Sequence, residues 1–172
     1  MKFSKVSQSR RWLVGASFIA LLLVICADRS FCQCQPPAEA RDVLWTKISA
    51  CLSNSTAKPP LPCIFVGTED GKDSGFGILA ARGGVSGSNY LLIPTRRLAG
   101  IEEPWLATDV APNYWLEAWT AGEKYVDEAY QASHGTPLQR SGLALAVNSG
   151  CVRTQDQLHI HISCTAKVSL MC

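Results

Sequence analysis

The sequence lacks an excess of basic residues outside its first eleven positions. The chain of 172 residues carries 16 Lys and Arg against 14 Asp and Glu, a formal charge of +2. Four of the basic residues precede an uncharged stretch near the N-terminus: Lys2, Lys5, Arg10 and Arg11. Without these four, 12 basic residues stand against 14 acidic ones, a net charge of −2. A body of this charge is not typical of a polyanion-binding protein, so we expect no nucleic acid as a partner.

The N-terminus also lacks an apolar run of the roughly 20 residues that a membrane-spanning helix usually needs. The uncharged stretch from Trp12 to Ala27 has only sixteen residues, although it follows a cationic start. This pattern is typical of a signal peptide or an uncleaved signal anchor over residues 1–27. Cleavage after Ala27 would place Ile25 where small residues are the rule, so we favour a retained anchor. The interpretation predicts a hydrophobic N-terminal helix, membrane contact through residues 12–27 and a body outside the cytoplasm.

The eight cysteines lack the CxxC pairs that mark many structural zinc sites. In an exported chain they predict disulfides instead. Cys51 and Cys63 enclose a Ser- and Pro-rich loop over 52–62, which gains stability from closure, so we predict a disulfide between them. The sequence leaves open the pairing of the remaining candidates: Cys32, Cys34, Cys151, Cys164 and Cys172.

The rest of the chain predicts a linker over 28–37 and one domain over 38–172, with no internal repeat. Hydrophobic periodicity predicts helices over 38–51 and 112–133. The apolar side of the second helix is expected to include Trp115, Trp119, Gly122, Val126 and Ala129. Alternation and turn residues predict strands at 64–67, 76–81, 90–94, 143–147 and 157–164, with a hairpin turn over 83–88. This order indicates an α+β fold with a mainly antiparallel β-sheet and packed helices.

The most informative stretch is the last predicted strand, in which polar and apolar residues alternate. One face carries Gln157, His159, His161 and Ser163, and the other carries Leu158, Ile160 and Ile162. Such a polar face is suited to bind an anion, transfer a proton or attack phosphorus. Metal binding is an alternative, because histidines at positions i and i+2 are common ligands. A metal would need a third ligand, and the only other histidine is His134 in a helix-end loop.

Residues 147–163 resemble the signature of the histidine-triad (HIT-like) superfamily, in which an Asn turn leads into His-apolar-His-apolar-His. The match is closer to the CDP-diacylglycerol pyrophosphatase branch, through Leu-Ala-Leu-Ala-Val-Asn-Ser and Arg-Thr-Gln followed by His-Ile-His-Ile-Ser-Cys. The resemblance covers most of residues 38–164. It implies a HIT-like fold and hydrolysis of CDP-diacylglycerol to CMP and phosphatidate, in phospholipid metabolism, with no cofactor and no metal. It also implies a bacterial inner-membrane location with the catalytic domain on the periplasmic side, and leaves a homodimer open.

The same resemblance assigns roles to individual residues. It makes His161 the nucleophile that forms a nucleotidyl-histidine, places His159 in the preceding triad position and puts Ser163 at the third. The residues implied to contact ribose or phosphate, or to lie beside the phosphate, are Asn148, Gln155, Asp156 and Gln157. Arg97 is a further candidate for pairing with phosphate, with a solvated loop residue as the alternative. A register shifted by two residues, in which His159 is the nucleophile, also stays open.

The chain departs from this branch at its C-terminus, where it ends eight residues after Cys164 although the branch continues. We therefore expect a domain that is incomplete at this end. Two alternative functions follow. One is a HIT-type hydrolase or transferase of soluble nucleotides, and the other is an inactive, truncated nucleotide-binding module.

Overall fold

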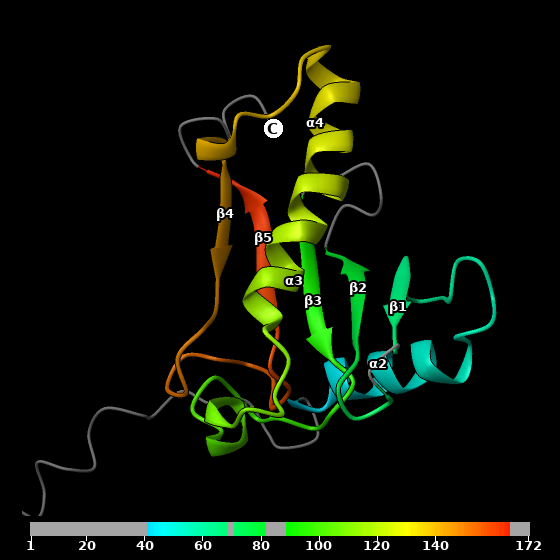
Figure 1. The fold of residues 1–172 in the computed structure, drawn as a ribbon, viewed down its shortest axis with the longest axis vertical. Coiled ribbons are helices and arrows are strands. Elements are labelled where there is room, and N and C mark those ends of the chain that lie inside the picture. The colour runs from blue at the N-terminus through cyan, green and yellow to red at the C-terminus, as the bar shows by residue number, and fades with distance from the viewer. Residues whose placement is uncertain (1–40, 69–70, 82–88, 166–172) are drawn as a thin grey trace, which may run out of the picture.

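A five-stranded sheet forms the centre of the computed structural model, which describes residues 41–68, 71–81 and 89–165. The strands are β1 (Phe65–Gly67), β2 (Phe76–Ala80), β3 (Tyr90–Pro94), β4 (Leu143–Ala146) and β5 (Ile160–Cys164). Their order across the sheet is β1-β2-β3-β5-β4, and each neighbouring pair is antiparallel (Figure 1). The predicted α+β class with an antiparallel sheet is therefore confirmed.

Strand β5 starts later than the sequence pattern suggests, because residues 157–159 are not part of the sheet. Its last pair with β3 joins Ile160 to Leu92. The next position on β3 that could extend this ladder is Pro94, which has no N–H to donate. Instead, the N–H of Leu158 donates to the carbonyl of Leu98 at 2.6 Å. The prediction of a strand over 157–164 is thus wrong for its first three residues.

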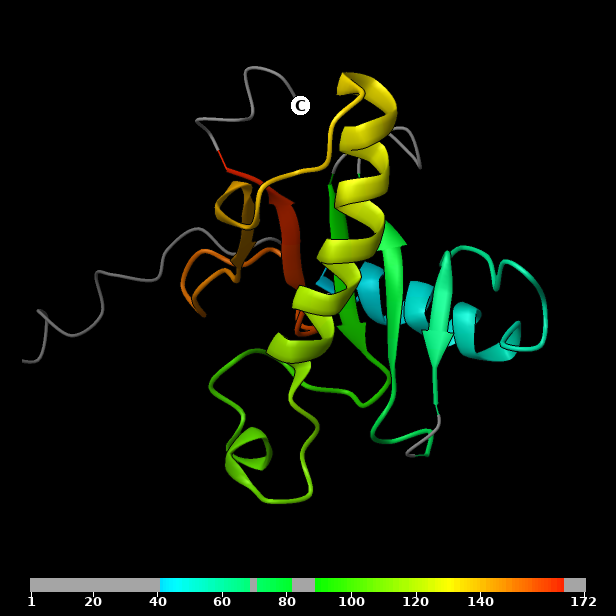
Figure 2. The ribbon, with the colours of Figure 1, turned by 45° about the horizontal axis from the view of Figure 1, so that its top comes forward.

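Helices cover both faces of the sheet (Figures 1 and 2). On one face, α3 (Tyr114–Ala121), the π-helical turn η4 (Gly122–Val126) and α4 (Asp127–His134) form one continuous helix. Asn113 caps its start by accepting the N–H of Leu116 at 3.1 Å, and Gly135 ends it with a φ of 71°. On the other face lies α2 (Val43–Ser53). Two short 3₁₀ turns, η3 (Pro104–Ala107) and η5 (Arg140–Gly142), belong to the connections.

The predicted apolar side of the long helix is wrong in its first half. The buried residues there are Tyr114, Ala118 and Ala121, whereas Trp115 is 41% exposed. The buried positions before the π turn each lie one residue earlier in the chain than predicted. A π turn holds one more residue than an α-helical turn, so the buried positions after it coincide with the predicted ones. After the turn, Gly122 and Val126 are buried as expected.

Two glycines allow the helices to approach the sheet closely. A Cβ on Gly122 would lie 2.7 Å from Cδ2 of Leu143 and 2.9 Å from Cγ2 of Ile162. A Cβ on Gly77 would lie 2.5 Å from Cδ1 of Ile48, on α2. The packing distance on each face therefore depends on a missing side chain.

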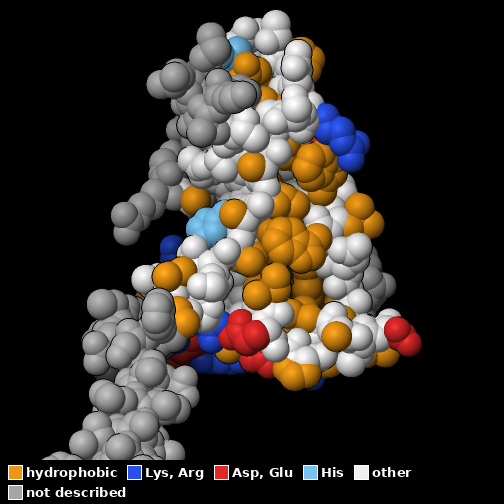
Figure 3. Space-filling view, turned by 90° about the vertical axis from the view of Figure 1, so that its left-hand side faces the viewer, with side chains coloured by type: hydrophobic (Ala, Val, Ile, Leu, Met, Phe, Trp, Pro, Cys, Tyr) orange, Lys and Arg blue, Asp and Glu red, His pale blue; other side chains and the backbone are white. Residues whose placement is uncertain are grey.

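Some large hydrophobic side chains stay at the surface. Ile101, Trp115 and Leu116 are each more than two-fifths exposed. Figure 3, which views the molecule from the side where β4 forms the edge of the sheet, shows hydrophobic groups gathered on this face.

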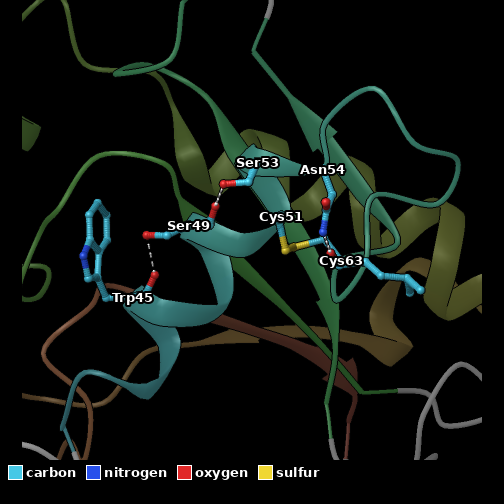
Figure 4. Close-up of a disulfide and its surroundings, with 7 residues drawn as sticks. Trp45, Ser49, Cys51, Ser53, Asn54 and Cys63 are labelled. Carbon is cyan, nitrogen blue, oxygen red and sulfur yellow. Dashed lines mark hydrogen bonds between the residues drawn. A yellow bond between two sulfur atoms is a disulfide. The ribbon is translucent and has the colours of Figure 1, made fainter.

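A smaller core lies between α2 and the sheet. Leu44, Ile48 and Cys51 of α2 pack there with four further buried residues: Cys63, Leu79, Leu91 and Ile93. The expected disulfide joins Cys51 to Cys63, with their Cα atoms 5.6 Å apart (Figure 4). Asn54, which follows α2, donates from Nδ2 to the carbonyl of Leu61 at 2.8 Å. Cys151 and Cys164 each take part in a disulfide as well.

Several expectations fall on residues that the structure does not describe. The N-terminal helix, the linker over 28–37 and the hairpin turn over 83–88 lie outside the described residues. Within residues 41–68, 71–81 and 89–165, no helix combines the length and apolar character needed to cross a membrane.

Candidate active site on the α2 face of the sheet

Strand β5 separates hydrophobic and polar side chains between the two faces of the sheet. Ile160 and Ile162 are almost completely buried in the core beneath the long helix. His161 lies between them in sequence, so its side chain points to the opposite face. In the register of the sheet, His161 lies opposite Leu91 of β3 and Ala146 of β4. Within β5, polar and apolar side chains therefore alternate between the two faces of the sheet, as the sequence predicts.

His161 lines a hollow of about 520 Å³ on the α2 face. Its polar lining residues are His161, Lys47 of α2 and Asn89, which immediately precedes β3. The remaining lining residues are apolar: Leu44, Leu79, Ala80, Ala81 and Leu91. The volume falls within the range of about 300–1,000 Å³ that is usual for small-molecule sites. A single lysine is the only formally charged group among these residues when the imidazole is neutral.

The surroundings of the His161 imidazole favour its neutral form. Its Nε2 atom is buried and has no hydrogen-bond partner. Burial, and secondarily the neighbouring His159, lower the pKa of His161 below 6.5. Desolvation disfavours the imidazolium, so the ring stays neutral near pH 7. A neutral ring with an unengaged nitrogen is a competent nucleophile.

His159 lies beside His161, although it precedes the first residue of β5. The two ring centroids are 5.0 Å apart in an edge-on arrangement. Nδ1 of His159 is 2.8 Å from the carbonyl oxygen of Gln157. A carbonyl can only accept, so this contact places a proton on Nδ1. The bond fixes the ring of His159, which is 8% exposed.

The loop before the histidines is held by its own polar side chains. Oε1 of Gln155 accepts the N–H of Leu44 at 3.1 Å, which ties the loop to the start of α2. Asp156 pairs with Arg41 and with Arg153. Gln157 is completely buried, and its Nε2 donates to the carbonyls of Pro94 at 3.0 Å and Arg96 at 2.9 Å. Three residues that the resemblance places near phosphate thus have structural partners within the protein.

An acidic residue extends this network. Arg153 also pairs with Glu102, and the hydrogen bond that it donates lowers the pKa of that carboxyl group. The guanidinium therefore joins Glu102 to Asp156. This arrangement secures the loop against the segment that follows β3.

The three remaining predicted site residues, Ser163, Asn148 and Arg97, lie in different surroundings. Ser163 shares the face of His161, but its hydroxyl donates to Oδ1 of Asn89. Asn148 lines a small crevice together with His159. Arg97 pairs with Asp42 and lies over the ring of Trp45, with its Cζ 5.3 Å from the ring centroid. The structure brings the two histidines together and gives Arg97 partners next to α2.

Two residues of the hollow were not predicted from the sequence. Lys47 resembles any other lysine on a helix, and no local pattern distinguishes it. Asn89 carries a signal only in hindsight, because it directly precedes the strand that pairs with β5. Both residues enter the site through tertiary packing.

The described residues include no group of three or more His, Cys, Asp or Glu side chains arranged to hold a metal ion. His134 is the last residue of α4, and its ring stacks on Tyr130 with centroids 4.1 Å apart. The end of α4 lies far from the start of β5 (Figure 1). His134 is therefore not placed to act as the third ligand beside His159 and His161.

Comparison with known proteins gives consistent matches. The family model described as CDP-diacylglycerol pyrophosphatase matches residues 39–169. The chain is 43% identical over 161 residues to the CDP-diacylglycerol pyrophosphatase of Yersinia pestis, which covers 92% of this chain and 57% of that protein. It is 35% identical over 133 residues to the probable CDP-diacylglycerol pyrophosphatase of Mycobacterium leprae (strain TN). This match covers 76% of this chain and 46% of that protein. The chain thus spans about half the length of these curated relatives.

Proposed function

Because the chain belongs to the CDP-diacylglycerol pyrophosphatase family, we propose that it hydrolyses CDP-diacylglycerol to CMP and phosphatidate through a nucleotidyl intermediate on His161. The substrate is a diphosphate that joins a nucleoside to a lipid. Cleavage must therefore stabilise negative charge while one phosphorus–oxygen bond breaks and another bond to phosphorus forms.

In the first step, the lone pair on Nε2 of His161 attacks the cytidine-side phosphorus. The bond from this phosphorus to the bridging oxygen breaks, and phosphatidate leaves with the bonding electrons. In the second step, water attacks the same phosphorus and the nitrogen–phosphorus bond breaks, which releases CMP and restores the imidazole. Each step exchanges one bond at phosphorus for another.

The neighbouring groups have distinct parts in this mechanism. His159, fixed by Gln157, orients the ring of His161 from 5.0 Å away. Lys47 offers a cation at the hollow, where it can pair with the phosphate charge. Asn89, which holds Ser163, contributes an amide beside the same hollow. We propose that Gln155, Asp156 and Gln157 act mainly by fixing the loop.

One observation carries the proposal: His161 lines a hollow that can hold a small molecule, and its Nε2 atom is buried without a hydrogen-bond partner. An unpaired buried nitrogen costs free energy in the free protein. Such a cost is usual where a group is kept ready for its substrate.

The wider setting of the enzyme belongs to the same proposal. We propose that the domain has the HIT-like arrangement and that residues 12–27 hold it at the bacterial inner membrane, with the site on the periplasmic side. The apolar stretch and the disulfide between Cys51 and Cys63 support this placement. Membrane fractionation of the full chain tests it, because a protein recovered only with soluble periplasmic contents would contradict the anchor.

Release of CMP from CDP-diacylglycerol, measured with and without EDTA, tests the activity. The proposal expects CMP release that the chelator does not change. Loss of turnover with EDTA would instead favour a metal site. Equal turnover of water-soluble CDP-alcohols would favour a soluble-nucleotide enzyme, and nucleotide binding without turnover would indicate an inactive module.

A further inference from the structure

A second concavity lies on the other face of the sheet, against the start of the long helix. It has a volume of about 530 Å³. Its walls come from the segment 101–107, the first residues of α3 and the buried side chains Leu158 and Ile160. Figure 3 shows hydrophobic side chains gathered on this side of the molecule, with acidic groups below them and a histidine next to them. We refer to this concavity as the α3 groove.

The α3 groove contains an unsatisfied hydrogen-bonding group. Tyr114 lines it and is only 3% exposed, and its hydroxyl has no hydrogen-bond partner. Burial raises the pKa of Tyr114 to about 12, so the hydroxyl keeps its proton at every pH at which the protein would work. Buried hydroxyls are nearly always paired, and an unpaired one is costly. Tyr114 therefore points to a hydrogen-bond acceptor supplied by a ligand.

The charge of the groove limits what that acceptor can be. Two carboxylates, Glu102 and Glu103, are among its lining residues, and none of the lining residues is basic. The lining residues offer an anionic group no cationic partner, whereas a neutral carbonyl oxygen needs none. The remaining lining is largely apolar and suits a hydrocarbon chain. An uncharged ester with an acyl chain combines both properties.

The groove adjoins the crevice that contains His159, just before β5. Val147 and Leu158 line the α3 groove and also the small crevice that contains His159. The hollow lined by His161 lies on the opposite face of the sheet, so a molecule that reacts there would reach the groove by passing around the start of β5, beside His159. We propose that the α3 groove binds an acyl chain of the diacylglycerol group, with the hydroxyl of Tyr114 donating to an ester carbonyl. This inference rests on the proposed function, because it assigns the lipid part of that substrate.

A substitution in the groove tests the assignment through substrate preference. Ala107 lines the groove and is exposed, so Ala107→Glu places a charge where the chain would lie. The ratio of kcat/KM for dioctanoyl CDP-diacylglycerol to that for CDP-glycerol should fall about tenfold or more. Tyr114→Phe removes only the hydroxyl and should lower the ratio about fivefold. Val110→Glu, a similar change three residues from Ala107 at an exposed position outside the groove, should leave the ratio unchanged. An unchanged ratio in both groove variants would overturn the proposal.

A binding measurement separates this proposal from the proposed function. Trp115 lines the groove and is partly exposed, so a medium-chain phosphatidate with bromine at its chain ends should quench its fluorescence. The full chain should show this quenching, and Trp115→Phe should lose most of it. Absence of any Trp115-dependent quenching would contradict the groove assignment. The assignment would also be wrong if quenching were absent because another part of the chain already filled the groove. Quenching without hydrolysis of any CDP ester would support the groove and contradict the proposed activity.

Discussion

The two faces of the sheet differ in the size of the hydrophobic core that covers them. The face beneath the long helix buries Ile160 and Ile162 in a continuous core, and Gly122 lets the helix approach them closely. The other face is covered by the shorter α2, whose buried residues pack on β2 and β3. Its hollow, lined by His161, Lys47 and Asn89, lies beside this smaller core. One face thus carries the larger core and the α3 groove, and the other carries a smaller core and the hollow lined by His161.

This difference shows how one strand can serve two purposes. Alternate residues of β5 contribute to the two faces, so neighbouring positions should respond differently to substitution. A change at His161 should affect chemistry, whereas a change at Ile162 should affect folding. Comparing the two positions separates a catalytic role from a structural one.

The largest effect is expected for His161→Ala, which removes the proposed nucleophile. CMP release from CDP-diacylglycerol should fall on the order of 10⁴-fold, as for other essential catalytic groups. Urea unfolding of the same variant should show a much smaller change than Ile162→Ala produces. Retention of more than a tenth of the activity would remove His161 from the mechanism.

Ile162→Ala is the matched change on the opposite face. Ile162 is completely buried, so the variant should lose about 2–5 kcal/mol of unfolding free energy. The molecules that remain folded should hydrolyse substrate at close to the original rate per active site. If activity were abolished while stability was unchanged, the division between the two faces would be wrong.

Lys47→Ala tests the cation of the hollow. The KM for CDP-diacylglycerol should rise about tenfold, because the phosphates lose one charged partner, while Lys47→Arg should restore most of the affinity. Lys124→Ala is a control on the long helix, where Lys124 lies over the ring of Tyr125. Equal effects of the changes at Lys47 and Lys124 would indicate a general effect of charge.

The smallest effect concerns pH. The proposed nucleophile must be neutral, and burial lowers the pKa of His161 below 6.5, so kcat/KM should decline only as the pH falls through a value below 6.5. His159→Gln removes the secondary cause of this shift and should move the acid limb upward by less than about one pH unit. Burial, the main cause, stays in place. An acid limb above 6.5 in the unsubstituted protein would contradict the assignment.

The sequence predicted the architecture well where the pattern is local. Strand β3 has the predicted bounds, and the long helix ends at His134, one residue after the predicted end. The disulfide between Cys51 and Cys63 followed from the composition of the loop that it closes. These features depend on residues close together in the chain, so periodicity and turn chemistry were sufficient.

Other features depend on tertiary contacts and were missed. The exposure of Trp115 follows from the π turn in the long helix, which a regular periodicity does not reveal. The start of β5 depends on Pro94, which lies on a different strand. Lys47 and Asn89 enter the hollow only through the packing of α2 and β3. The roles assigned to the site residues stay predictions until they are measured.

Isolation of the covalent intermediate tests the central claim most directly. Rapid quenching during turnover, followed by peptide mass spectrometry, should locate a cytidylyl group on His161. The adduct should be absent in His161→Ala and still form in His159→Ala, although more slowly. A group found on His159, or an adduct that persists in His161→Ala and disappears in His159→Ala, would show that the nucleophile is His159.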